Sequence, residues 1–244
     1  MKEIENKKLK GDKILINYVD EGSGTTLLFL HGNLVSHHYF KKEILEFKDR
    51  YRVVAPDTRG HGQSSFGSGP VNLDTLSDDL HLLIKSLRLK DIVLIGHSDG
   101  ANIALKYLTK YDDVIGAVSL SGNISPKGLF RIPYLFFEMR RKVTQFLGRF
   151  NKKYMERSIL LSLITKSQNI SMEDLKKIKV PVLYIVGSKD IIDIDHTNKM
   201  VANTPKGSLY VAKGVGHHVL KNYLPAEKLI EEFVNTLIES NSTA

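Results

Sequence analysis

Apolar residues along the chain form short runs that alternate with segments of helical periodicity. Residues 92–95 are four consecutive β-branched or leucine residues, which predict a strand buried on both faces. Leucine and isoleucine at positions 73, 76, 80, 83, 84 and 87 keep helical spacing, with Asn72 or Asp74 as the cap. Further strands are predicted at 13–19, 25–30, 51–55, 114–120, 182–186 and 208–212, and further helices at 36–47, 99–111, 194–202 and 225–238.

This alternation predicts an α/β fold with a mostly parallel sheet covered by helices on both faces. A turn at residues 20–24 separates the first two strands, which are predicted to form a hairpin. Residues 123–179 lack a strand pattern but are rich in helix formers, so they are predicted to be a helical cap. The predicted domains are a core of residues 1–122 and 180–244 and a cap of residues 123–179. Because α/β folds bind ligands at the carboxyl ends of strands, the cap is predicted to be a lid.

Composition removes several classes of protein. The absence of cysteine excludes disulfides, thiolate zinc sites and a cysteine nucleophile. The net charge is +8, but the lysines are spread along the chain without a basic recognition motif, so nucleic acid is not an expected partner. No apolar run is long enough to span a bilayer, and residues 1–8 are charged with no apolar region behind them. A cytoplasmic monomer or homodimer without stable membrane insertion is expected.

Ser98 lies where the strand at 92–95 gives way to a helix, within Gly96-His97-Ser98-Asp99-Gly100. The pattern Gly-x-Ser-x-Gly is short, and its alternative interpretation is a glycine-rich strand-to-helix turn. Its position directly after a buried strand favours a nucleophile elbow, in which side chains at the two glycine positions would meet backbone. The hydroxyl would then stand at a helix N-terminus, where backbone N–H groups point outward.

A serine hydroxyl is a weak nucleophile at neutral pH and needs a base that is oriented by a carboxylate. His217 follows the last predicted strand in a glycine-rich turn and is the predicted base, with His218 as the alternative. Asp190 is the predicted carboxylate, because it follows a strand and lies between the serine and the histidine in chain order. The nearby Asp193 and Asp195 are predicted to cap the next helix.

The oxyanion formed by attack on a carbonyl needs two N–H donors that are already in place. The backbone N–H groups of Asp99 and Asn33 are the predicted donors, the second from the loop after the strand at 25–30. Gly32 allows that loop to approach closely, and His31 is predicted to hold the loop by hydrogen bonds.

Taken in chain order, these motifs resemble the α/β-hydrolase superfamily, and the resemblance covers nearly the whole chain. It implies that the loop at 57–64 is structural. The serine at position 98 and the absence of tryptophan separate the chain from haloalkane dehalogenases, and the same serine separates it from epoxide hydrolases. The matching motifs are His31-Gly32, Asp57-x-Arg59-Gly60-His61-Gly62-x-Ser64, Gly96-His97-Ser98-Asp99-Gly100, Gly187-x-x-Asp190 and Gly214-x-Gly216-His217.

The leading hypothesis is a serine hydrolase of small carboxylic esters that works through an acyl-enzyme and needs no metal or organic cofactor. An Asp99 carboxylate facing the pocket would favour a cationic group, as in an amino-acid ester, whereas an Asp99 that is paired or caps the helix would not. The alternatives are a carbon–carbon bond hydrolase, a thioesterase, or a ligand sensor of the same fold with little turnover.

The predicted cap mixes aromatic and basic residues. One interpretation is a set of amphipathic helices with their apolar faces on the core and their charges in water. The others are an acyl-binding wall and an interfacial helix that associates weakly with an anionic lipid surface. The predicted substrate contacts are Phe130, Tyr134 and Phe137 of the cap, together with Asn33 and Asp99.

Overall fold

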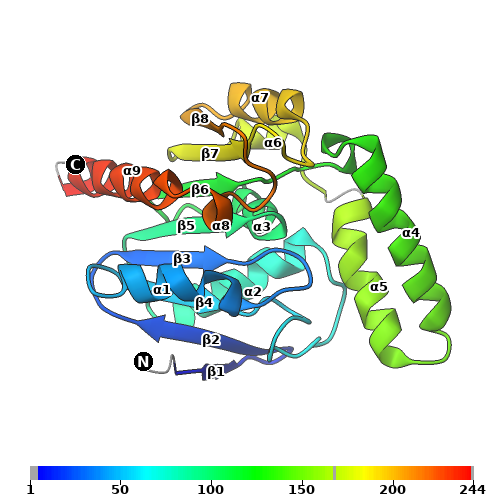
Figure 1. Ribbon diagram of the computed structural model, residues 1–244. Helices are drawn as coiled ribbons and strands as arrows, with labels where there is room; N and C mark the ends of the chain where they lie inside the picture. The colour runs from blue at the N-terminus through cyan, green and yellow to red at the C-terminus, as the bar shows by residue number, and fades with distance from the viewer. Residues whose placement is uncertain (1–4, 167–168, 243–244) are drawn as a thin grey trace.

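The computed structural model describes residues 5–166 and 169–242, which are built around one eight-stranded sheet (Figure 1). The strands lie in the order β1-β2-β4-β3-β5-β6-β7-β8, parallel from β4 to β8 and antiparallel at the β1 and β2 edge. The predicted α/β class is confirmed. The strands are β1 (Lys7–Lys10), β2 (Leu15–Glu21), β3 (Thr26–Leu30), β4 (Arg52–Pro56), β5 (Ile92–His97), β6 (Gly116–Leu120), β7 (Val182–Gly187) and β8 (Gly207–Ala212).

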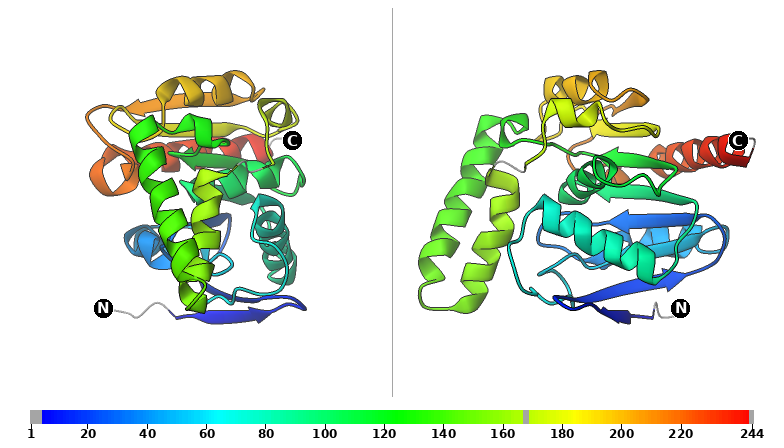
Figure 2. Two further views of the ribbon diagram at one scale, coloured as in Figure 1. Left: turned by 90° about the vertical axis from the view of Figure 1, so that its right-hand side faces the viewer. Right: turned by 180° about the vertical axis from the view of Figure 1, so that it is seen from behind.

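Helices cover both faces of the sheet and enclose two apolar cores (Figures 1 and 2). One core is covered by α1 (Lys41–Phe47), α8 (Val219–Asn222) and α9 (Pro225–Ser242). The other is covered by α2 (Leu73–Ser86), α3 (Asp99–Leu108), α6 (Met172–Leu175) and α7 (Ile194–Ala202). Asn72 rather than Asp74 caps α2, because its side chain accepts a hydrogen bond from the Thr75 N–H.

The predicted hairpin of the first two strands is wrong. β2 pairs with β1 and β4, whereas β3 lies between β4 and β5. Every residue of β3 is buried, and a strand buried on both faces requires a central place in the sheet rather than one near the edge. The edge strand β1 was not predicted, since it has the sequence Lys-Lys-Leu-Lys and only Leu9 packs against the core.

The segment 123–179 contains the short turn η2 (Pro126–Gly128) and two long helices, α4 (Arg131–Leu147) and α5 (Lys152–Thr165). These helices pack side by side beyond the carboxyl ends of the parallel strands (Figures 1 and 2). The interpretation that apolar cap faces pack on the core is wrong for α4, whose apolar side chains are mostly exposed. Residues 167–168 of this segment, and residues 1–4 of the charged N-terminal stretch, lie outside the described residues.

Membrane-spanning segments are not found among the helices of the described residues, since none of them combines the necessary length with the necessary apolar character.

The Asp57 carboxylate holds the loop after β4, as expected for a structural loop. It accepts hydrogen bonds from Asn17 Nδ2 (2.9 Å), from the backbone N–H groups of His37 (2.8 Å) and Gln63 (2.9 Å), and from His37 Nδ1 (2.8 Å). Burial opposes ionisation of the carboxyl, but these hydrogen bonds outweigh it and hold the pKa of Asp57 well below its usual 3.8.

We expect Asp57→Asn to lower the free energy of unfolding at neutral pH by about 3 kcal/mol, because the amide turns an NH2 group toward buried donors. The pKa of Asp57 is lower in the folded protein than in the unfolded chain, so its ionised carboxylate stabilises the fold at pH values above the unfolded pKa of 3.8. This stabilisation is lost as the pH falls through the folded pKa. Urea unfolding over a pH series should therefore show a weaker acid-induced loss in the variant. Asp112→Asn, at a side chain that is 84% exposed, is the control. Equal stability of the Asp57 variant and the wild type at neutral pH would contradict this role.

Candidate active site

Ser98 stands at the sharp turn from β5 into α3, in a backbone conformation that is rare for serine (φ 55°, ψ −119°). The glycines on either side are required by space. A Cβ on Gly96 would overlap the backbone of Gly100, and a Cβ on Gly100 would overlap the carbonyl oxygen of Leu30. The turn therefore keeps the serine in a strained position at the N-terminus of a helix, which is the geometry of a nucleophile elbow.

The structure brings Ser98, His217 and Asp190 into one hydrogen-bonded chain. His217 Nε2 lies 3.0 Å from Ser98 Oγ, and His217 Nδ1 lies 2.7 Å from Asp190 Oδ1. Because an ionised carboxylate only accepts hydrogen bonds, Nδ1 carries the proton and Nε2 is free to accept the Ser98 hydroxyl. This is the arrangement that a general base needs.

Asp190 is held in place and kept ionised by its surroundings. Its side chain is fully buried, which opposes ionisation, but hydrogen bonds from His217, from Ser121 Oγ (2.6 Å) and from the Ile192 N–H (3.1 Å) lower its pKa below the usual value. Sequence reasoning missed Ser121, which follows β6 and has φ 53°. A serine at the end of a buried strand was the only available signal.

Two neighbouring strands place the acid and the base at one edge of the sheet. Asp190 follows β7 and His217 follows β8, which pairs with β7 in parallel. The two loops pack closely, because a Cβ on Gly187 would overlap the carbonyl oxygen of Val215. For His218, the alternative base, Nδ1 lies 3.5 Å from the Tyr39 hydroxyl, whereas the ring that contacts Ser98 Oγ is that of His217.

The alternative acids lie at the start of the next helix. Asp193 caps α7 by accepting a hydrogen bond from the Asp195 N–H, and Asp195 belongs to the first turn of that helix. The structure therefore assigns both residues to the helix rather than to His217.

His97 is a buried neighbour of the site that sequence reasoning did not select. Its Nε2 donates to the backbone carbonyl of His217 (3.0 Å), and its ring stacks on Tyr39 with centroids 4.6 Å apart. Burial and the nearby His217 lower the pKa of His97 to about 3, so the ring stays neutral. His97 thus fixes the loop that carries His217. Its only signal in the sequence is its place directly before Ser98.

The loop after β3 passes directly beside the serine. A Cβ on Gly32 would lie 3.2 Å from the Cβ of Ser98, so glycine allows the close approach. His31 holds this loop, because its Nδ1 donates to the Gly32 carbonyl (2.8 Å) and its Nε2 accepts from the Thr58 N–H (3.0 Å). Burial lowers the pKa of His31 to about 3, consistent with this neutral tautomer.

A side-chain bridge links Asn33 to Asp99 and to the cap. Asn33 Nδ2 donates to Asp99 Oδ2 (2.6 Å) and to the carbonyl oxygen of Leu160 on α5 (2.8 Å). Asp99 is only 5% exposed, and within the described part of the chain its carboxylate forms no ion pair with lysine or arginine. Burial raises the pKa of Asp99 to about 6, against the opposing effect of the Asn33 hydrogen bond.

The predicted cap contacts are only partly placed by the structure. Phe130 precedes α4 and is about half exposed, while Tyr134 and Phe137 are partly buried on α4. Phe137 packs against Phe136 with ring centroids 5.6 Å apart. Contact of these three residues with a substrate stays a prediction.

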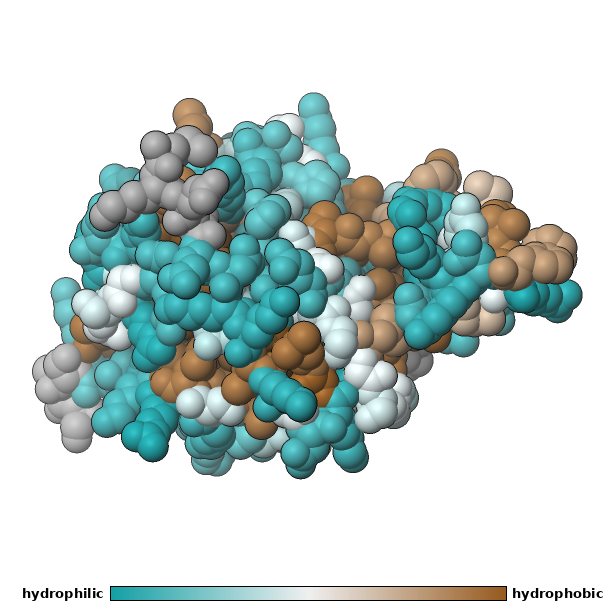
Figure 3. Space-filling view, turned by 90° about the horizontal axis from the view of Figure 1, so that it is seen from below, coloured by the Kyte–Doolittle hydropathy of each residue, from teal (hydrophilic) through white to brown (hydrophobic). Residues whose placement is uncertain are grey.

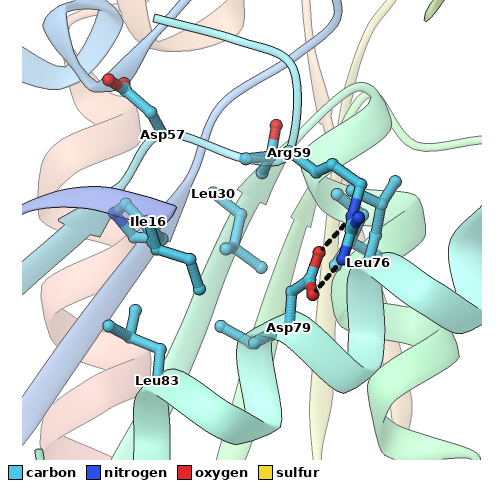
Figure 4. A pocket seen from close by; sticks show the side chains of 11 residues that line it. Ile16, Leu30, Asp57, Arg59, Leu76, Asp79 and Leu83 are labelled. Carbon is cyan, nitrogen blue, oxygen red and sulfur yellow. Dashed lines mark hydrogen bonds and ion pairs between the residues drawn. The ribbon is translucent and has the colours of Figure 1, made fainter. Parts of the chain in front are cut away.

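A pocket lies between β2, β3 and α2 (Figure 4). Its lining is mostly apolar, and the guanidinium of Arg59 meets the Asp79 carboxylate there at 2.7 Å. Ser98, Asp190 and His217 do not line it, so we assign this pocket to the packing of the core.

Across the described residues, no group of three or more histidine, aspartate or glutamate side chains is arranged to hold a metal ion.

Comparisons with known proteins agree with this architecture. A family model described as the alpha/beta hydrolase fold matches residues 25–140. The AB hydrolase superfamily protein YisY of Bacillus subtilis is 27% identical over 89% of this chain and 94% of its own length. The crystal structure of E-2-(acetamidomethylene)succinate hydrolase has a TM-score of 0.79 at 21% identity, covering 96% of this chain and all of that one. A thermophilic esterase from Thermogutta terrifontis has a TM-score of 0.78 at 22% identity, covering 96% and 99%.

Proposed function

Because this chain belongs to the α/β-hydrolase superfamily, we propose that it is a serine hydrolase that cleaves small carboxylic esters. The observation that carries the proposal is the hydrogen-bonded chain from Ser98 through His217 to the buried Asp190. That chain supplies a nucleophile, a base with a free acceptor nitrogen, and a carboxylate that stabilises the imidazolium.

In the proposed mechanism, His217 Nε2 takes the hydroxyl proton as Ser98 Oγ attacks the ester carbonyl. The oxyanion accepts hydrogen bonds from two backbone N–H groups, that of Asp99, the residue after Ser98, and that of Asn33, in the loop that passes beside Ser98 at Gly32. The tetrahedral intermediate collapses as His217 gives the proton to the leaving alcohol, and an acyl-enzyme remains. Water then attacks the acyl group with His217 again as base, which releases the acid and restores Ser98.

A panel of substrates tests the proposed bond. We expect saturable hydrolysis of short-chain p-nitrophenyl esters, with one nitrophenolate released for each acid formed. Thioesters, anilides and a substrate cleaved at a carbon–carbon bond should turn over more slowly. Faster cleavage of any of these than of the esters would move the assignment to that class. If no substrate of the panel is hydrolysed faster than in buffer without the protein, the alternative of a ligand sensor with little turnover would be favoured.

We further infer that the substrate carries a cationic group close to the scissile ester. The Asp99 carboxylate is buried beside Ser98, and its hydrogen-bond partner, the Asn33 amide, is neutral. A substrate ammonium group would compensate a negative charge that otherwise opposes the oxyanion. The alternative for Asp99 is a side chain that is paired or caps the helix. The observed bond from Asn33 occupies one carboxylate oxygen and leaves the other available.

We expect Asp99→Asn to lower the wild-type preference for an α-amino ester over its des-amino analogue by about tenfold or more. Because the pKa of Asp99 is raised to about 6, the wild-type preference should exist above that pH and fade as the carboxyl is protonated below it. It should also fade above about pH 8, where the amino group of the ester loses its charge. The measurement is the ratio of the two kcat/KM values over a pH series, since a pH effect on the shared catalytic step cancels in that ratio. Asp195→Asn is the matched control. An unchanged ratio in the Asp99 variant would remove the inference.

A further inference from the structure

One side of α4 presents a stripe of apolar side chains to solvent. Its members recur at intervals of three or four residues, so they share one face of the helix. Ile132 is 82% exposed and Phe150, just beyond the helix, is 80% exposed, whereas the buried residue of α4 is Thr144. The stripe consists of Ile132, Leu135, Phe136, Met139, Val143, Phe146 and Phe150.

Large contiguous apolar patches are rare on the surfaces of soluble proteins. Where they occur, they mark surfaces that bind a partner, a ligand or a membrane. α4 packs against α5 with its opposite side, and α5 is tied to the body through the carbonyl of Leu160 and the side chain of Asn33. Figure 3 shows apolar residues gathered on the lobe that projects from the body of the molecule. The stripe therefore lies on the outer side of the cap.

The segment that carries the stripe is strongly positive. Residues 130–157 contain eight basic and two acidic side chains, a net charge of +6 against +8 for the whole chain of 244 residues. One of the two acids, Glu138, is neutralised by a hydrogen-bonded pair with Arg141. The concentration of charge in this segment is not evident from composition alone, because the remaining residues carry a net charge of only +2.

Two of the basic side chains lie against rings of the stripe itself. The guanidinium carbon of Arg140 is 5.7 Å from the centroid of Phe136, and that of Arg149 is 5.5 Å from the centroid of Phe146. Apolar and cationic groups are thus interleaved on one surface. A helix of this kind lies in the interface of a bilayer, with apolar side chains among the acyl chains and cations at the lipid phosphates.

We propose that the outer face of α4 docks on the surface of an anionic lipid bilayer. A second copy of this chain is the less suitable occupant, because two cap segments of charge +6 would face each other across the contact. The helix would lie along the surface rather than cross it. Docking there would turn the cap, and the edge of the sheet that carries Ser98, toward the membrane. The proposal does not depend on the proposed hydrolysis, because it concerns binding alone.

The test is cosedimentation of the purified protein with phosphatidylcholine vesicles that contain or lack phosphatidylserine. We expect binding to the anionic vesicles that weakens as salt is raised, and much weaker binding to phosphatidylcholine alone. Ile132→Ser and Phe146→Ser should each lower the partition coefficient about fivefold or more, whereas Leu224→Ser, at a residue that is 86% exposed outside the cap, should not.

A matched pair of lysines tests the charge. Lys152 and Lys228 are 88% and 79% exposed, and each faces a glutamate four residues later at 3.6 Å. Lys152→Glu should lower the partition coefficient about fivefold or more, and Lys228→Glu should leave it nearly unchanged. Absence of binding at low salt, equal loss in both lysine variants, or equal binding to neutral vesicles would overturn the proposal. So would a stable dimer that dissociates on Ile132→Ser, because the stripe would then be a contact between copies.

Discussion

Ser98→Ala lowers kcat for a good ester substrate by roughly 10⁶-fold, the largest effect that we expect for any single substitution in this protein. In the proposed mechanism the hydroxyl 3.0 Å from His217 Nε2 forms the acyl-enzyme, so its loss should remove the covalent pathway. His217→Ala should cost a similar factor, since the hydroxyl then has no base. Asp190→Asn should cost about 10⁴-fold, because an amide at that position favours the wrong tautomer of His217.

These losses should not add, because the three residues act as one unit. The measurement is steady-state hydrolysis of the best p-nitrophenyl ester by the single variants and by the Ser98 and His217 double variant. Ser86→Ala, at an exposed serine on α2, is the matched control and should keep wild-type activity. Equal rates for wild type and Ser98→Ala would rule out the nucleophile and leave the ligand-sensor alternative.

Gly100→Ala should destabilise the folded protein by more than about 4 kcal/mol or prevent its folding, the largest loss of stability that we expect. The added Cβ would overlap the backbone carbonyl of Leu30, on the strand next to the elbow. No change of side-chain rotamer can relieve a clash between a Cβ and backbone. The start of α3 and the end of β3 would have to move apart where both are buried.

Urea or thermal unfolding measures this effect, and the yield of soluble protein measures it if the variant does not fold. Gly216→Ala is the matched control, because a Cβ there would make only an ordinary contact of 3.5 Å and the backbone needs no positive φ. The close packing of the elbow against β3 would be contradicted if the two glycine variants were equally stable.

The sequence was sufficient for the central strands because each of them is a run of apolar residues followed by a turn. The place of each strand in the sheet was harder to predict. The turn at residues 20–24 indicated only that the chain reverses, and the full burial of β3 decided against a hairpin with β2. The edge strand β1 carries a single apolar residue, which gives no periodic signal.

In the candidate site, too, some residues could be predicted from the sequence and others could not. Ser98, Asp190 and His217 could be selected because each follows a strand, and parallel strands end at one edge of the sheet. His97, Ser121 and the Asn33 side chain could not be selected in this way, since their roles depend on contacts between loops far apart in the chain.

The sequence also could not predict which side of α4 is exposed to solvent. The spacing of its apolar residues defines a stripe but not whether the stripe packs on the core or faces solvent. That choice depends on how α4 packs against α5, and the structure places the stripe outside.

The central claim is that Ser98 is the activated nucleophile, and labelling with a fluorophosphonate tests it most directly. This reagent forms a covalent adduct with a serine whose hydroxyl is deprotonated by a neighbouring base, whatever the natural substrate is. We predict one adduct per chain, located at Ser98 by peptide mass analysis, absent in Ser98→Ala and formed much more slowly in His217→Ala. An adduct on another residue, or labelling of Ser98→Ala at the wild-type rate, would contradict the account.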